Sequence, residues 1–321
     1  MISLKHLEKS TKSTNTFARS APATLTLMEN ISDLTVSERV NRNPVCVKLS
    51  KDEYVNMATG EVGTYAHSEN RGQLGESLRK TSRHVRELIN TNVTDCTHVR
   101  WVTLTYRENM TDPKRLMRDY ELFWKRFMHR CKKENRGNPE YISVIEPQGR
   151  GAWHIHALFI WGEDAPFIPN RVLADLWRHG FVSIKQPKDC DNLGAYFSGY
   201  LADMPEEDVL ALSGEQRLAA QVSAAMNGTA VPVELQTADG DTKKIIKGAR
   251  MALYPPGINI YRHSQGIRKP TIIKTTYHNA ERYLQGSVQT YSQSFEIVDE
   301  KGVVVNRIMK ASYNKNRKKE D

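Results

Sequence analysis

Two histidines and one glutamate form the first group of residues whose types and spacing could carry chemistry. His154 and His156 stand two residues apart in the apolar segment 153–161. Side chains at this spacing on a β-strand point to the same face, so both imidazoles could bind one metal ion. Glu146 ends the preceding β-rich segment, and a hairpin would bring its carboxylate beside them. Such mixed ligation with open positions suits Mg²⁺, Mn²⁺ or a similar ion. The alternative is a pair of core histidines with satisfied hydrogen bonds.

A second group contains two tyrosines. Tyr196 and Tyr200 stand four residues apart in a segment with helical character. They differ by about 40° around a helix axis and about 6 Å along it, so they share a face. Simple core packing would produce the same spacing. Thr103 and Thr105 alternate in the segment VTLTY, which alone indicates only strand propensity.

The elements that must position these residues alternate between strands and helices. Alternating β-rich stretches predict strands, and apolar residues at three- and four-residue steps after Asp112 and Pro113 predict a long amphipathic helix. Strands are expected at 100–106, 141–146, 153–161, 181–185 and 258–267, and helices at 73–92, 113–131, 170–179 and 193–204. This order predicts an α+β fold, in which helices cover one face of a central antiparallel sheet and 153–161 is a central strand.

Composition divides the chain into four parts. The N-terminal part is rich in Ser, Thr and Asn with weak periodicity, and we expect little order there beyond a strand at 45–49. An acidic, Ala- and Gly-rich insert follows the tyrosine helix. The expected parts are an N-terminal extension at 1–70, a core at 71–204, the insert at 205–250 and a C-terminal segment at 251–321 that completes the core and ends in a basic tail.

The charge distribution favours a polyanionic partner. The 321 residues carry a formal net charge of +9, with a pI near 9.3. Residues 71–136 hold 16 basic and 8 acidic residues, whereas 201–241 hold 8 acidic residues and one Arg. A basic core of this kind suits nucleic acid first and an anionic membrane surface second. Solvated charged faces would give the same pattern.

Several classes of protein are excluded by what the sequence lacks. No window of 18 apolar residues predicts a membrane span, and the first residues lack the apolar stretch of a secretory signal. The four cysteines are far apart and form no CxxC pair, so we expect neither a disulfide framework nor a zinc ribbon. These features predict a cytoplasmic protein.

Taken together, the motifs resemble the HUH endonuclease superfamily. The order is WVTLTY at 101–106, VIEPQGRGAWHIHALF at 144–159 and AYFSGYL at 195–201. Within that superfamily the chain is most similar to the two-tyrosine rolling-circle replication initiators of bacterial plasmids and phages. The basic helix before the first motif and YPPGINIYRHSQGIRKP at 254–270 also resemble bacterial members. The resemblance covers about 73–204 and 250–270, and it implies the palm-like sheet of that superfamily.

The resemblance implies an enzyme that nicks one DNA strand at an origin. A tyrosine, Tyr196 or Tyr200, would attack the scissile phosphate and form a 5′-phosphotyrosine link, and the stored bond would later be rejoined. Phenols ionise only near pH 10, so a divalent metal on Glu146, His154 and His156 would stabilise the developing charge. Two tyrosines would allow two successive transfers.

One departure from the family concerns lysines. In two-tyrosine initiators each tyrosine is usually followed three residues later by Lys, whereas here Gly199 and Asp203 occupy those positions. The missing lysines would help to bind the phosphate or carry a proton. Lys185 and Lys188, just before the helix, are the candidate substitutes.

The expected partner is single-stranded or hairpin origin DNA in a bacterial host. Basic side chains near the motifs would follow its backbone. The candidates are Arg150, Lys185, Arg262 and Arg268. The sequence has no P-loop motif, so a host helicase is expected to unwind the DNA and a host polymerase to extend the free 3′ end.

Two other classes of function remain open. A transposase or mobilisation relaxase would use the same chemistry, although relaxases usually place their tyrosine near the N-terminus and the single-tyrosine transposases are shorter. A nucleic-acid-binding protein on the same scaffold, without catalysis, would explain the missing lysines. The two catalytic classes require Glu146, His154 and His156 to converge near a tyrosine hydroxyl.

Overall fold

The computed structural model divides the chain into two compact units. One unit contains Ser68–Lys269, and the other contains Met1–His67 together with Pro270–Asp321. The structure describes residues 17–40, 46–65, 75–226, 231–236, 242–255, 257–299 and 301–317, without the side chains of 75–78, 200, 235, 236, 242 and 243.

An antiparallel sheet of five strands forms the centre of the Ser68–Lys269 unit. Its order is β13-β7-β8-β6-β9. The strands are β6 (Val99–Leu104), β7 (Glu140–Pro147), β8 (Trp153–Ile160), β9 (Val182–Lys185) and β13 (Tyr261–His263). The α+β class is confirmed, β8 is central as its apolar pattern predicted, and the segment after the insert does rejoin the sheet.

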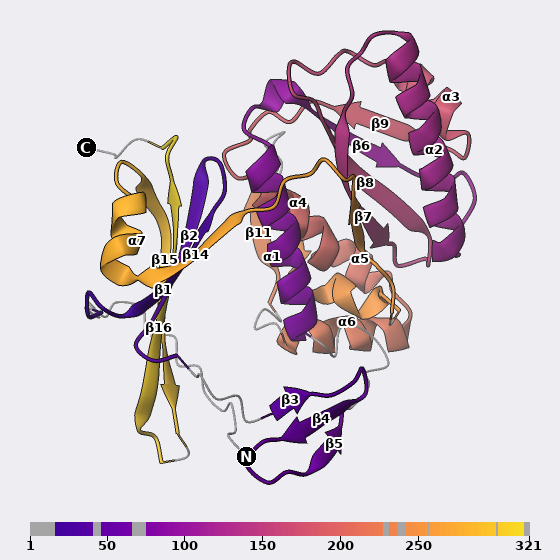
Figure 1. Ribbon diagram of the computed structural model, residues 1–321. Helices are drawn as coiled ribbons and strands as arrows, with labels where there is room; N and C mark the ends of the chain where they lie inside the picture. The colour runs from indigo at the N-terminus through magenta and orange to yellow at the C-terminus, as the bar shows by residue number, and fades with distance from the viewer. Residues whose placement is uncertain are drawn as a thin grey trace. The chain divides into compact units, whose positions relative to one another are not determined.

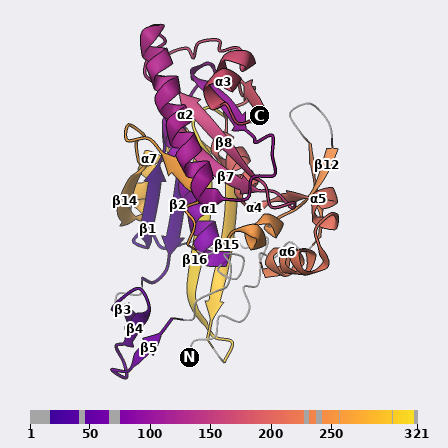
Figure 2. The same cartoon turned by 90° about the vertical axis from the view of Figure 1, so that its right-hand side faces the viewer.

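Helices cover both faces of this sheet rather than one. On the first face, α2 (Pro113–Lys133) and α3 (Asn170–Trp177) lie together, and Phe127 of α2 packs 4.8 Å from the Phe159 ring (Figures 1 and 2). On the opposite face, α4 (Leu193–Ala202) packs its Phe197 ring 4.9 Å from Trp101.

The helix α1 (Gly75–Asn92) packs beside α4 on that second face. The expected single covered face was therefore wrong. The reason is that the alternate residues of β6, β7 and β8 are apolar on both sides, and each side has to be buried.

Local signals explain where α2 begins. Asp112 caps the helix, and its carboxylate accepts a hydrogen bond from the backbone N–H of Lys114 at 2.8 Å. Pro113 occupies the first helical position, where its missing N–H costs nothing. Among the described helices, none is both long enough and apolar enough to cross a bilayer.

The acidic insert is a folded subdomain. It contains α5 (Glu206–Leu210), α6 (Gly214–Met226), and a small sheet of β10 (Met204–Pro205), β12 (Thr242–Ile246) and β11 (Val233–Gln236). The short helix η3 (Ala249–Leu253) follows. A separate apolar core of Met204, Val209, Leu212, Ala220, Ala224, Ile246 and Ala249 holds these elements together.

The other unit joins the two ends of the chain. Its five-stranded sheet has the order β14-β1-β2-β16-β15, and α7 (Tyr277–Tyr283) packs against β1. The strands are β1 (Pro22–Leu27), β2 (Ile31–Ser37), β14 (Thr271–Thr276), β15 (Val288–Val298) and β16 (Val304–Asn314). A small sheet contains β3 (Cys46–Lys48), β4 (Glu53–Asn56) and β5 (Val62–Thr64).

This unit differs from the expected division at 70 and 251. The described part of 1–70 is largely strand, because the alternation in PATLTL and ISDLTVS buries Leu25, Leu34 and Val36. The segment expected to complete the core does so only up to Lys269, and the rest pairs with the N-terminal strands. Residues 1–16, 41–45, 66–70 and the last four residues of the basic tail, 318–321, lie outside the described residues.

Candidate active site

The hairpin of β7 and β8 brings the predicted metal ligands to one face. The register places Glu146 directly opposite His154, and Val144 opposite His156. Residues opposite each other or two apart on antiparallel strands point to the same side. Glu146, His154 and His156 therefore share the face that α1 and α4 cover, while Phe159 and its alternate neighbours face α2.

His156 is held from two sides. Its Nδ1 lies 3.1 Å from the Oγ1 of Thr103, the residue paired with it on β6. Its Nε2 contacts Oε2 of Glu146. Both ring nitrogens thus have fixed partners, and the ring itself is buried. The threonine of the TLT strand, ambiguous in the sequence, orients an imidazole in the structure.

Glu146 also binds a buried arginine from the far end of the insert. Nη1 of Arg250 lies 2.7 Å from Oε1 of Glu146, with side-chain exposures of 5% and 11%. Burial alone would raise the pKa of the Glu146 carboxyl. The hydrogen bond from His156 and the Arg250 guanidinium outweigh burial and hold that pKa below its ordinary value.

His154 is held neutral by its surroundings. Burial is the main cause, and it lowers the pKa of His154 to about 4 against the pull of Glu146. Its Nδ1 lies 3.2 Å from the side-chain nitrogen of Gln148, and the Oε1 of Gln148 accepts a hydrogen bond from Nε of Arg150 at 3.1 Å. A neutral imidazole is the form that binds a metal.

The three predicted ligands fit a divalent ion in kind but are not gathered around one. Two imidazoles and a carboxylate share a face, and the Nε2 of His156 already meets the Oε2 of Glu146, as two ligands of one ion would. Thr103 holds the outer nitrogen of His156, which is the usual arrangement behind a metal ligand. Yet within the described ranges, no three His, Cys, Asp or Glu side chains are arranged so that they could hold a metal.

The tyrosine helix lies on the same face of the sheet. Tyr196 is 52% exposed, and its ring packs edge-on against Trp101 at 5.5 Å. Trp101 in turn lies 6.4 Å from the His156 ring. A single tryptophan thus joins the exposed tyrosine to the histidine pair. Tyr200 lies in α4, but its side chain is outside the described residues.

A close approach to α1 fixes the start of α4. Gly194 donates its N–H to Oδ1 of Asn90 at 3.1 Å, and a Cβ at this position would stand 2.5 Å from that oxygen and 2.6 Å from the carbonyl of Arg86. Only glycine allows this contact. Asn192 caps the helix through its side chain, which also accepts from Asn90 at 3.2 Å.

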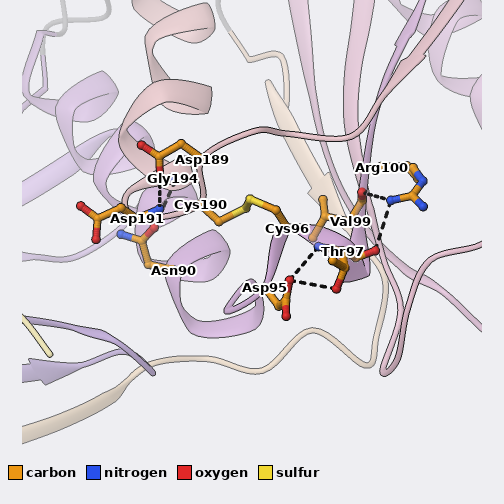
Figure 3. Close-up of a disulfide and its surroundings, with 10 residues drawn as sticks. All are labelled: Asn90, Asp95, Cys96, Thr97, Val99, Arg100, Asp189, Cys190, Asp191 and Gly194. Atoms are coloured by element: carbon orange, nitrogen blue, oxygen red, sulfur yellow. Dashed lines mark hydrogen bonds between the residues drawn. A yellow bond between two sulfur atoms is a disulfide. The ribbon is translucent and has the colours of Figure 1, made fainter. Parts of the chain in front are cut away.

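A disulfide fixes the loop that precedes α4. Cys190 is joined to Cys96, the first residue of η2 (Cys96–His98) just before β6, across 94 residues of chain (Figure 3). The Cα atoms lie 5.6 Å apart, well within the range of disulfides. The expectation that no cysteines pair was wrong for these two, since sequence distance does not show which loops the sheet brings together.

Asp203, where the family usually has lysine, has a structural role here. It ends α4, and its Oδ1 accepts from the backbone N–H of Gly248 at 3.1 Å. Burial raises the pKa of this carboxyl. A Cβ at Gly199 would find Asp203 at an ordinary contact distance of 3.6 Å. The departure thus joins the tyrosine helix to the insert.

The basic residues expected to follow DNA mostly have contacts within the chain. Arg150 binds Gln148, and Nη1 of Arg262 pairs with Glu121 at 2.8 Å. Arg268 donates to the carbonyl of Thr91 at 3.0 Å. Lys185 is exposed at the end of β9. A role of these four residues in DNA binding stays a prediction.

Arg250 is the site residue that sequence reasoning missed. It lies in the insert, 104 residues from Glu146, and no motif contains it. An isolated arginine at the end of an acidic segment has no signal that distinguishes it from a surface residue. Only the packing of η3 against the end of α4 brings it to the metal motif.

Comparison with known families gives one match. Residues 99–205 match a family model described as replication-associated protein, of the ORF2 group. The match begins at β6 and ends at β10, so it includes the hairpin of Glu146 and the histidines as well as α4. Comparisons with curated proteins and with solved structures find no match. The family match supports a role related to replication.

Proposed function

We propose that this chain is a rolling-circle replication initiator of the HUH type, which cuts and rejoins one DNA strand through a tyrosine. The observation that carries the proposal is the common face of Glu146, His154 and His156, to which Trp101 joins the half-exposed Tyr196. The similarity of residues 99–205 to replication-associated proteins supports it independently.

The proposed reaction is a transesterification. The phenol oxygen of Tyr196 or Tyr200 forms a bond to the scissile phosphorus, and the bond from phosphorus to the 3′ oxygen breaks. The phenol loses its proton and the 3′ oxygen gains one, so the products are a 5′-phosphotyrosine and a free 3′ hydroxyl. The reverse reaction rejoins the strand without ATP.

The residues of this chain would divide the work. Trp101 would keep Tyr196 near the histidine pair, and Thr103 would keep His156 oriented. Glu146, His154 and His156 would hold Mg²⁺ or Mn²⁺, which polarises the phosphate and stabilises the charge of the transition state when bound. The substrate would be single-stranded or hairpin DNA, with a host helicase and polymerase acting on either side of the reaction.

A second candidate is binding of nucleic acid without catalysis. The pairing of Glu146 with Arg250 favours it, because the carboxylate is then engaged by a cation of the chain itself. Under this alternative the polar face would only orient the strands and α4. The two candidates differ in whether a covalent bond to DNA forms.

A covalent-adduct assay tests the proposal. Purified protein is incubated with Mn²⁺ or Mg²⁺ and labelled single-stranded oligonucleotides that tile the DNA on either side of its own gene. We expect a metal-dependent protein–DNA band on a denaturing gel that is lost in the double variant Tyr196→Phe/Tyr200→Phe. Tight DNA binding without such a band, with either metal, would favour the non-catalytic candidate.

A further inference from the structure

Arg250 stands out among the buried charges because of where its bonds go. Its guanidinium contacts two separate segments of the unit, and the residue is only 4% exposed. Nη1 contacts Oε1 of Glu146 at 2.7 Å and the carbonyl of Pro147 at 3.0 Å, and Nε donates to the carbonyl of Asp203 at 2.9 Å. The arginine therefore binds the end of strand β7 and the end of the tyrosine helix.

The carboxylate of Glu146 is divided between two partners. Oε1 takes Arg250, and Oε2 faces the Nε2 of His156. Asp203 takes Arg250 through its backbone carbonyl, while its own carboxylate accepts from Gly248. Glu146 is thus the acidic side chain that the guanidinium contacts directly, and the pair carries no net charge.

We infer that Arg250 is a built-in counter-cation of Glu146, which keeps the predicted metal site weak until a phosphate arrives. This inference rests on the proposed function. A divalent ion on Oε2 of Glu146 would lie about 5 Å from the guanidinium. Even at an effective dielectric constant of about 40, that repulsion weakens binding of the ion by more than about a hundredfold.

Arg250 also has an opposing effect, because it orients the carboxylate. Loss of a group that orients a metal ligand typically weakens metal binding by about 10–100-fold. The charge effect is the larger of the two, so removal of the charge should strengthen metal binding. The same pairing accounts for the ungathered ligands, since the guanidinium already neutralises the carboxylate that would attract the ion.

The arrangement has a consequence for the order of binding. A site whose own charges cancel attracts a dication poorly. The phosphodiester of bound DNA would supply the missing negative charge, so the ion and the strand would bind together. Arg250 would in this way confine a nicking activity to the moment when the substrate is in place, and it acts through Glu146 as a positioning residue.

Binding of Mn²⁺ alone, followed by electron paramagnetic resonance, tests this inference without any reaction. We expect Arg250→Gln to bind Mn²⁺ at least about tenfold more tightly than the wild type, and Arg250→Lys to stay within about threefold of it because the charge is kept. The added Glu146→Gln change should abolish the gain. Unchanged or weaker binding by Arg250→Gln would overturn the inference.

A second measurement keeps the test valid if Arg250→Gln does not fold. In the wild type, with nitrogen-labelled arginine, the guanidinium signals of Arg250 should shift on saturation with Mg²⁺, and static signals would contradict the inference. The two levels of the account can be told apart. If neither protein binds Mn²⁺, the proposed metal-assisted function fails too. If the wild type forms the metal-dependent DNA adduct but Arg250→Gln gains no affinity, only the role of Arg250 is wrong.

Discussion

The two faces of the central sheet differ sharply although they come from the same strands. Toward α2, Phe159 of β8 packs against Phe123, Trp124 and Phe127 at ring distances of 4.8–6.2 Å. Toward α1 and α4, the alternate residue His156 takes part in a network of hydrogen bonds and charges. Alternation along a strand thus separates a face that stabilises the fold from a face suited to chemistry.

The difference shows how a buried polar network is tolerated. Groups such as Glu146 and Arg250 contribute little net stability when paired, but they cost several kcal/mol when one partner is lost. The aromatic face supplies the burial that keeps the strands together regardless of what the other face binds. Variants on the two faces should therefore separate stability from activity.

Truncation of the aromatic face should have the largest effect on stability. Phe159 is fully buried, so Phe159→Ala removes its transfer energy and leaves a cavity, and it should lower the free energy of unfolding by about 3–5 kcal/mol. Urea denaturation followed by circular dichroism measures this. Leu122→Ala on the exposed side of α2 is the matched control, with a loss within about 0.5 kcal/mol. A loss below about 1 kcal/mol for Phe159→Ala would contradict the assignment of stability to this face.

The disulfide should give the next largest effect and should act on the chemical face. Reduction of Cys96–Cys190 frees the loop before α4, and it should lower the free energy of unfolding by about 2–4 kcal/mol. Alkylation of the unreduced, unfolded protein should modify only Cys46 and Cys131. Cys46→Ser, which leaves the pair intact, should unfold like the wild type. Four alkylated cysteines in protein purified without reductant would refute the pairing.

Protonation of His154 should make the metal-free protein sensitive to acid. Its folded pKa of about 4 lies below the ordinary value of 6.5, so the unfolded chain binds the extra proton. The penalty is absent above pH 6.5, grows as the pH falls, and reaches at most about 3 kcal/mol near pH 4. Denaturation curves in chelator should show it as a difference between wild type and His154→Gln. Parallel pH profiles for the two proteins would show that His154 titrates normally.

The smallest expected effect sharpens the comparison within the polar face. Thr103→Val keeps the shape of the side chain but removes the hydroxyl next to Nδ1 of His156, and it should cost about 1 kcal/mol of stability. Because the ring is then oriented less well, Mn²⁺ binding should weaken about tenfold. Thr105→Val, whose hydroxyl binds the carbonyl of Phe181 instead, is the matched control. Equal Mn²⁺ binding by both variants would remove Thr103 from the site.

Much of the fold could be predicted because local patterns determine it. The alternation in the TLT strand, the cap at Asp112 and the apolar run around His156 predicted a strand, a helix start and a central strand that the structure contains. The common face of Glu146 and the two histidines also follows from a hairpin with alternating side chains.

What could not be predicted depends on distant parts of the chain. The Arg250–Glu146 pair and the Cys96–Cys190 disulfide join residues about a hundred positions apart, and no local propensity encodes such contacts. The strands β1 and β2 show alternation but were missed because their polar residues resemble those of a disordered segment. Their partners β14 and β16 lie more than two hundred residues away, so their burial was not evident.

The most direct test of the central claim is to identify the residue that becomes bonded to DNA. The protein–DNA adduct is digested with protease and nuclease, and the peptide that carries the nucleotide is sequenced by mass spectrometry. The account predicts a metal-dependent modification of Tyr196 or Tyr200 on α4, above the face of Glu146, His154 and His156. A modification at any other residue, or an adduct that persists in Tyr196→Phe/Tyr200→Phe, would contradict it.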